Sequence, residues 1–222
     1  MSSLKKQLAL YLVTDRGLLK GRELLSSVLE AVWGGVTMVQ LREKDCPANE
    51  FASLAARLKE VLTPHAVPLI INDRIDIALA MRADGAHIGQ SDIPVPEARR
   101  LLKRGRPFGK RPILGVSVQN LAEARQAEKA GADYLGAGVV YPTSTKTDYK
   151  DTIGIHGLQA VCSGVRIPVI AIGGTNAANI GELAGVPRLA GVAVVSAILT
   201  AGDIRDAARE LKTLWEGESC PP

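Results

Sequence analysis

The segment from Gln40 to Lys44 carries an amide and two cations at alternate positions, directly after an apolar run. Alternate side chains of a β-strand point the same way, so Gln40, Arg42 and Lys44 are expected on one face. Arginine and lysine together suit a phosphate or a diphosphate. A surface charge cluster at the start of a loop is the other interpretation of this segment.

Two aspartates, Asp73 and Asp92, each come shortly after a separate apolar run. If these runs are neighbouring strands about 5 Å apart, both carboxylates can reach one hard cation. Mg²⁺ fits oxygen ligands, few protein contacts and a substrate phosphate. For either aspartate alone we favour a helix cap. Together, and beside the cations of the 40–44 segment, they favour a metal site.

Two later segments, 173–175 and 195–197, combine glycine or small residues with a hydroxyl after apolar runs. Glycine lets backbone N–H groups approach an anion, and a helix that follows adds positive potential. These segments therefore predict a phosphate cradle without naming the ligand. Ser117 lies inside another apolar run and has no His–Asp pair to activate it, so we expect it to hydrogen-bond an anion.

A polar segment from Tyr141 to Thr152 contains three neighbouring hydroxyls followed by Lys146. Such a loop suits anion capture and, being longer than its neighbours, a mobile lid. A flexible surface loop explains the same composition equally well. His87 follows a strand-like run and can face the same site, but a hydrogen-bonded structural histidine is the favoured interpretation.

The elements that must position these residues alternate regularly between short apolar runs and longer helical patterns. Strands are predicted at 8–13, 36–41, 68–71, 85–88, 113–118, 134–137, 168–172 and 191–195. Helices are predicted at 22–33, 47–62, 73–81, 95–103, 121–130, 157–163, 176–183 and 203–215. Eight strand–helix units predict a parallel sheet closed into a (β/α)₈ TIM barrel. An open doubly wound sheet usually has a Gly-rich turn after its first strand, where this chain has Thr14-Asp15-Arg16.

Length and composition agree with one small barrel. The chain has 222 residues, of which 46% are hydrophobic and 23% charged. Such barrels typically have about 250 residues and can be as short as about 200. We therefore expect one catalytic domain over 1–222, with about 217–222 as a frayed tail. Function gathers at the carboxyl ends of the strands in this fold. All the candidate residues above follow predicted strands.

Several classes of protein are disfavoured. The net charge is +4, and its densest basic run, 99–111, contains a single aromatic residue, Phe108, so nucleic-acid binding is not expected. Three separated cysteines support neither a disulfide framework nor a zinc site. No signal peptide or membrane span is indicated, which favours the cytoplasm. Whether the chain forms a homo-oligomer is left open.

Taken in order, these segments resemble the thiamine-phosphate synthase family. The matching blocks are 40–44, 71–74, 84–92, 115–118, 133–146, 171–174 and 191–197. As a set they are specific and span nearly the whole chain. The resemblance implies a transferase that couples 4-amino-2-methyl-5-(diphosphooxymethyl)pyrimidine with thiazole phosphate, giving thiamine phosphate and diphosphate by a dissociative route. It implies Mg²⁺ as cofactor and small molecules as partners.

The resemblance also assigns residues. It places Mg²⁺ on Asp73 and Asp92. Catalytic roles fall on Arg42, Lys44, Ser117 and Lys146. Pyrimidine diphosphate binding falls on Gln40, Leu41, Arg42, Glu43, Lys44, Asn72, Ser117 and Lys146. Thiazole phosphate binding falls on Thr143, Ser144, Thr145, Gly174, Val195 and Ser196.

Three segments depart from the family pattern, namely 103–111, 147–153 and Gln119, which stands where relatives often carry histidine. The glutamine bears on the alternatives. A thiazole tautomerase of the same fold uses a histidine near this position as its acid/base, a role that Gln119 cannot take. A non-catalytic phosphate-binding barrel is the other alternative, and it predicts that Asp73 or Asp92 is missing.

Overall fold

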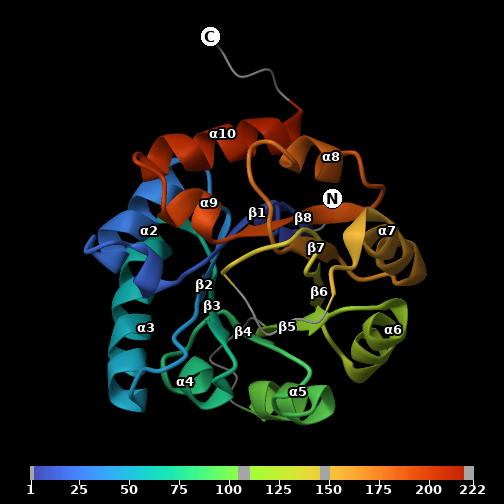
Figure 1. Ribbon diagram of the computed structural model, residues 1–222. Helices are drawn as coiled ribbons and strands as arrows, with labels where there is room; N and C mark the ends of the chain where they lie inside the picture. The colour runs from blue at the N-terminus through green and yellow to red at the C-terminus, as the bar shows by residue number, and fades with distance from the viewer. Residues whose placement is uncertain (1–2, 105–110, 146–150, 218–222) are drawn as a thin grey trace.

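The computed structural model describes residues 3–104, 111–145 and 151–217. Lys146 and the expected tail beyond residue 217 lie outside these ranges, as do parts of both unusual segments. Among the described residues, no helix is both long and apolar enough to cross a membrane. The fold can be followed from strand to strand in Figure 1.

Eight parallel strands close into a barrel in which β1 pairs with both β2 and β8. The strands are β1 (Leu10–Val13), β2 (Met38–Leu41), β3 (Leu69–Asn72), β4 (Gly85–Ile88), β5 (Ile113–Val118), β6 (Tyr134–Gly138), β7 (Val169–Ile172) and β8 (Leu189–Val194). The predicted TIM barrel is confirmed, and β4 and β5 have the predicted bounds. The other strands differ from prediction by one or two residues at an end.

Helices surround the barrel as an outer ring (Figure 1). The α-helices of this ring are α2 (Leu24–Trp33), α3 (Ala48–Leu62), α4 (Ile75–Ala80), α5 (Val95–Arg104), α6 (Leu121–Ala130), α7 (Gly154–Gly164), α8 (Ile180–Ala184) and α10 (Ile204–Glu216). Short 3₁₀ turns lie at Arg16–Leu18 and Thr63–His65. Last in the chain, α10 packs on α2 and α8, so the ring closes as the sheet does.

Alternation along the strands divides the core into two layers. On β1, Leu10 and Leu12 join the large cluster between sheet and helices. Tyr11 and Val13 join a smaller cluster inside the barrel. A period of two thus supplies a helix-facing row and an interior row from every strand. The upper end of the interior row is what a ligand at the mouth can reach.

Two short helices were not predicted. The first, α1 (Ser3–Gln7), packs Leu4 against the interior cluster, at the end of the barrel where the strands begin. The second, α9 (Ser196–Leu199), starts directly after β8. Four- and five-residue helices are too short to show a clear period of 3.6 residues, which is why the sequence pattern did not reveal them.

Of the predicted helices that begin late, two have a clear local reason. The segment predicted from residue 73 becomes helical at Ile75, because Asp73 has a left-handed φ of 60° that no α-helix contains. The segment predicted from residue 176 becomes α8 at Ile180. There the Asn176 side chain accepts from the Ala178 N–H at 2.9 Å, an asparagine turn that competes with helix.

Candidate active site

A cavity of about 460 Å³ lies at the mouth of the barrel, and residues from all eight strands line it. Twelve of the predicted site residues are in its lining: Gln40, Arg42, Lys44, Asn72, Asp73, Asp92, Ser117, Thr143, Thr145, Gly174, Val195 and Ser196. Segments far apart in the sequence therefore meet at one place because their strands end at one rim.

Three other predicted site residues are not in that lining. Leu41 is fully buried and belongs to the cluster between sheet and helices. Glu43, two residues after Leu41, is also absent from the cavity lining. Both follow the alternation that sends Gln40, Arg42 and Lys44 inward. Ser144 lies next to two lining residues without being one. The side chains of Leu41 and Glu43 therefore do not line this cavity, and their assignment to substrate binding stays a prediction.

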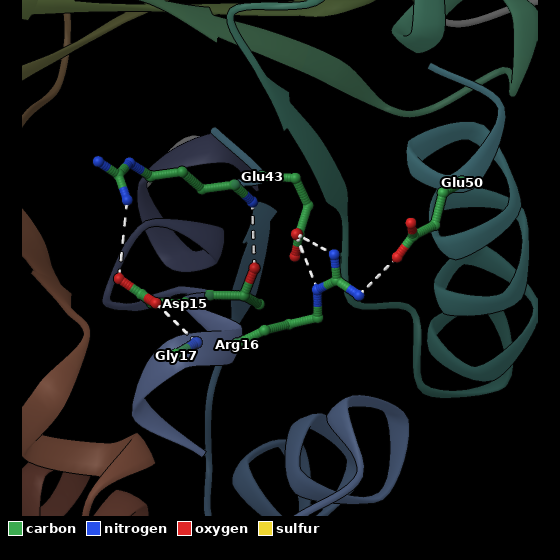
Figure 2. A network of polar contacts seen from close by, with 7 residues as sticks. Asp15, Arg16, Gly17, Glu43 and Glu50 are labelled. Carbon is green, nitrogen blue, oxygen red and sulfur yellow. Dashed lines mark hydrogen bonds and ion pairs between the residues drawn. The ribbon is translucent and has the colours of Figure 1, made fainter. Parts of the chain in front are cut away.

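Glu43 is instead held by Arg16 (Figure 2). The Arg16 Nε donates to Glu43 Oε2 at 2.8 Å, and its Nη1 donates to Glu50 Oε1 at 2.7 Å. Arg16 thus joins the turn after β1 to the end of β2 and to α3. Its charge compensates the Glu43 carboxylate, which is only 7% exposed. Arg16, from the turn after β1, therefore pairs with the carboxylate that lies between Arg42 and Lys44 in the sequence.

Arg42 is positioned by the turn after β1, which sequence reasoning did not connect with it. The Arg42 backbone N–H donates to Thr14 Oγ1 at 3.1 Å, and Asp15 Oδ2 lies 3.8 Å from Arg42 Nη1. Figure 2 shows Asp15 on the other side of this turn from Arg16. The signal was present in Thr14-Asp15-Arg16, read earlier only as the absence of a glycine turn.

Asp73 and Asp92 meet at the mouth. Both side chains line the same cavity, and the Asp92 carboxyl group is near enough to change the pKa of Asp73. Burial, and next the Asp92 carboxylate, raise the pKa of Asp73 to about 6, while Arg42 acts in the opposite direction. Burial and a neighbouring carboxylate both disfavour the charged form of Asp73, and a bound cation would offset both effects. Asp92 accepts a hydrogen bond from the Gly89 N–H at 2.7 Å, which lies before the following helix. The N-cap residue of α4 is Arg74, so Asp73 does not cap that helix.

The donor set fits a hard cation that brings its other ligands with it. No group of three or more His, Cys, Asp or Glu side chains able to hold a metal occurs in the described ranges. Two carboxylates beside Arg42 and Lys44 are too few for an all-protein cage, but they match the way Mg²⁺ is shared between carboxylates and phosphate oxygens.

The opposite side of the mouth is built from backbone. Gly173 and Gly174 after β7 have φ values of 99° and 70°. A β-carbon on Gly174 would lie 2.7 Å from the Tyr141 carbonyl oxygen, so a side chain fits there only if the loop after β6 moves. Nearby, the buried Thr175 Oγ1 has no hydrogen-bond partner among the described residues. Val195 and Ser196 begin α9 beside this turn.

A chain of hydrogen bonds crosses the barrel interior below the cavity. Gln40 Nε2 donates to Tyr11 Oη, which contacts Tyr134 Oη, each at 2.9 Å. Tyr134 Oη bonds His87 Nδ1, and His87 Nε2 bonds Ser117 Oγ, again at 2.9 Å. His87 is hydrogen-bonded as predicted, and it also lines the cavity. Burial raises the pKa of both tyrosines, which keeps them neutral.

Comparison with known proteins gives one consistent result. Residues 10–198 match the family described as thiamine monophosphate synthase. The chain is 49% identical over 208 residues to the thiamine-phosphate synthase of Syntrophomonas wolfei, covering 94% of this chain and 96% of that protein. It is 49% identical over 202 residues to that of Clostridium acetobutylicum, covering 90% and 91%. A solved thiamine phosphate pyrophosphorylase from Pyrococcus furiosus superposes with a TM-score of 0.86 at 38% identity, covering 97% and 98%.

Proposed function

The chain belongs to the thiamine monophosphate synthase family, and from this premise we propose which substrates its mouth holds and how. It is a transferase that makes thiamine phosphate. We propose that the donor is a hydroxymethylpyrimidine diphosphate and the acceptor a thiazole phosphate. One C–O bond of the donor breaks, diphosphate leaves with the bonding pair, and the thiazole nitrogen forms the new C–N bond.

The residues of the charged side suit departure of diphosphate. Arg42 and Lys44 supply two positive charges to its oxygens, and Ser117 can donate a hydrogen bond to them. Lys146, outside the described residues, is proposed to add a third charge. A dissociative reaction needs the charge of its leaving group stabilised more than it needs a strong base, and fixed cations provide that stabilisation.

The two substrates are proposed to enter from different sides. Gln40 and Asn72, on β2 and β3, would orient the pyrimidine ring. Gly174, Val195 and Ser196 would bind the thiazole phosphate through backbone N–H groups, with the hydroxyls of 143–145 beside them. This arrangement leaves the attacked carbon and the attacking nitrogen facing each other across the mouth.

Asp73 and Asp92 are proposed to hold Mg²⁺, whose chemistry would be to neutralise the diphosphate as it departs. The support is that Asp73, Asp92 and Arg42 line one cavity, where Asp92 raises and Arg42 lowers the pKa of Asp73. The cytoplasm remains the proposed location. A tautomerase or a purely phosphate-binding barrel is not favoured, because the relatives at 49% identity are thiamine-phosphate synthases.

One observation carries this proposal: acidic and basic side chains from the ends of β2, β3 and β4 converge on one cavity. The test is turnover of both substrates with and without Mg²⁺, followed by release of diphosphate. We expect thiamine phosphate only when all three are present. Tight binding of either substrate without product would contradict the proposal and favour the binding barrel. Isomerisation of a thiazole substrate alone would favour the tautomerase.

A further inference from the structure

The hydrogen-bonded chain inside the barrel begins and ends at residues of the mouth. Gln40 on β2 and Ser117 on β5 both line the cavity. Between them, Tyr11 and Tyr134 are fully buried and His87 is 5% exposed. The chain therefore links two sides of the site through groups that are buried or nearly buried.

The barrel is shaped to hold this chain. A β-carbon on Gly115 would lie 2.1 Å from Tyr134 Cζ and 2.4 Å from His87 Nδ1. A β-carbon on Gly136 would lie 3.2 Å from His87 Cε1. Two neighbouring strands, β5 and β6, thus have glycine where Tyr134 and His87 need the space. An interior filled only for stability needs neither buried phenols nor this space, because branched aliphatic residues fill most such barrels.

One order of donors runs along the whole chain when each hydroxyl passes its hydrogen to the next group, starting from Gln40. Gln40 Nε2 donates to Tyr11 Oη, and in this order Tyr11 gives its one hydrogen to Tyr134. Tyr134 then gives its hydrogen to His87 Nδ1. A neutral imidazole that accepts at Nδ1 carries its proton on Nε2, and it donates to Ser117 Oγ.

This polarity decides what the two ends offer to a ligand. In this order Gln40, whose Nε2 is used by Tyr11, has its carbonyl Oε1 left as the acceptor for a ligand in the cavity that it lines. Ser117, already accepting from His87, turns its hydroxyl hydrogen to the cavity as a donor. If the Gln40 amide rotated by half a turn, each bond would reverse. Ser117 would then donate to His87 and offer only lone pairs to an anion.

We propose that this chain is a relay that couples recognition of the pyrimidine ring to binding of the diphosphate, with Tyr11, Tyr134 and His87 as positioning residues. The inference rests on the proposed function, which puts the pyrimidine at Gln40 and the diphosphate at Ser117. A ring amino group donates to Gln40 Oε1 and keeps Ser117 a donor. A ring carbonyl in its place favours the reversed chain, which weakens diphosphate binding.

The test measures how a ring at one end changes diphosphate affinity at the other. Inorganic diphosphate with Mg²⁺ is titrated calorimetrically into the protein saturated with 4-amino-2,5-dimethylpyrimidine or with its 4-oxo counterpart. We expect diphosphate to bind about tenfold more tightly with the amino ring, a typical size for coupling between two sites. In Tyr134→Phe the two rings should give equal affinities, because the middle hydroxyl is absent.

Matched variants separate coupling from loss of structure. Ser27→Ala removes a buried hydroxyl on α2, whose Oγ donates to the Glu23 carbonyl at 2.7 Å, and should keep the difference between the rings. If Tyr134→Phe does not fold, Tyr11→Phe breaks the same chain one bond away and should abolish the difference too. In either variant the KM for the pyrimidine diphosphate should rise, while that for thiazole phosphate should not.

The outcomes distinguish the relay from the function on which it rests. A wild-type protein that forms thiamine phosphate but binds diphosphate equally with both rings overturns the relay alone. So does a Tyr134→Phe protein that keeps the difference. A wild-type protein that forms no product under any condition overturns the proposed function and the relay with it.

Discussion

The two sides of the barrel mouth are built from different materials. The side formed by β2, β3 and β4 presents charged side chains, among them Arg42, Asp73 and Asp92. The side formed by β7 and β8 presents two glycines with positive φ and the start of α9. One side therefore acts through charge that can be removed without moving backbone. On the other side the backbone itself would bind the ligand, so a substitution that alters binding also alters the backbone.

This difference predicts two kinds of mutant. A substitution on the charged side should reduce activity and leave folding largely unchanged, because its residues sit at strand ends outside the packed layers. A substitution on the glycine side should cost stability first and affinity second. The following experiments test that contrast.

The largest effect is expected from Asp92→Asn. The variant keeps an oxygen that accepts from the Gly89 N–H but loses the charge that Mg²⁺ requires. Turnover at saturating Mg²⁺ should fall about 10³-fold, with an unchanged unfolding midpoint. Asp76→Asn, an exposed carboxylate paired with Arg74, is the control and should be active. An active Asp92→Asn protein would remove the metal assignment.

Arg42→Lys should come next. It keeps the charge of residue 42 but loses the planar fork that binds two oxygens at once and that Asp15 helps to orient. We expect kcat/KM for the pyrimidine diphosphate to fall about 10²-fold, because a small misplacement of the substrate reduces the rate by about this factor. Steady-state kinetics with each substrate varied would show it. The same change at exposed Arg74 should have no effect, and equal effects at both sites would argue against a grip on diphosphate.

Acidity should weaken metal binding through Asp73. Its pKa is raised from the ordinary 3.8 to about 6, so below pH 6 a proton occupies the site. Mg²⁺ affinity should then drop about tenfold for each pH unit below 6, as one proton is displaced per ion. The measurement is Mg²⁺ titration by calorimetry between pH 5 and pH 8.

Stability of the metal-free protein should change in the opposite direction. A raised folded pKa means that the folded state binds the proton more tightly than the unfolded state. The stabilising contribution is complete below about pH 4 and is lost as the pH rises through about 6. Asp73→Asn should remove this part of the pH dependence of urea unfolding. An unchanged profile in that variant would show that another group is responsible.

The smallest effect on turnover is expected from Gly174→Ala. The new methyl group meets the Tyr141 carbonyl, and alanine disfavours a φ of 70°. We expect a loss of about 1–3 kcal/mol in unfolding free energy. The KM for thiazole phosphate should rise and kcat should stay near wild type. Gly181→Ala on α8, where a β-carbon meets nothing within 4 Å, is the control and should be neutral in both measurements.

Sequence patterns predicted the barrel because each strand is a short apolar run followed by the residues that matter. Asp73 and Asp92 were recognisable in this way, since strand ends of a parallel barrel share one rim. The same pattern of alternation, applied strictly, also excludes Leu41 and Glu43 from the cavity. The assignment of these two residues to substrate binding came from the family resemblance and stays a prediction.

The interior chain was out of reach for a different reason. Tyr11 and Tyr134 are 123 positions apart, and nothing local to either indicates the other. Their contact is fixed by the strand registers, which accumulate around the closed sheet. The pairing of Gly115 with Tyr134 across β5 and β6 is one of those registers. A one-residue slip would turn Tyr134 toward the helices.

Closure of the sheet between its first and last strands has a consequence for synthesis on the ribosome. Leu10 on β1 pairs with Val192 on β8, so one edge of β1 has no partner strand until nearly the whole chain has left the ribosome. Until then that edge offers unpaired amides to any other nascent strand. A polypeptide that ends before β8 should be insoluble, because β8 supplies the hydrogen bonds for this edge of β1.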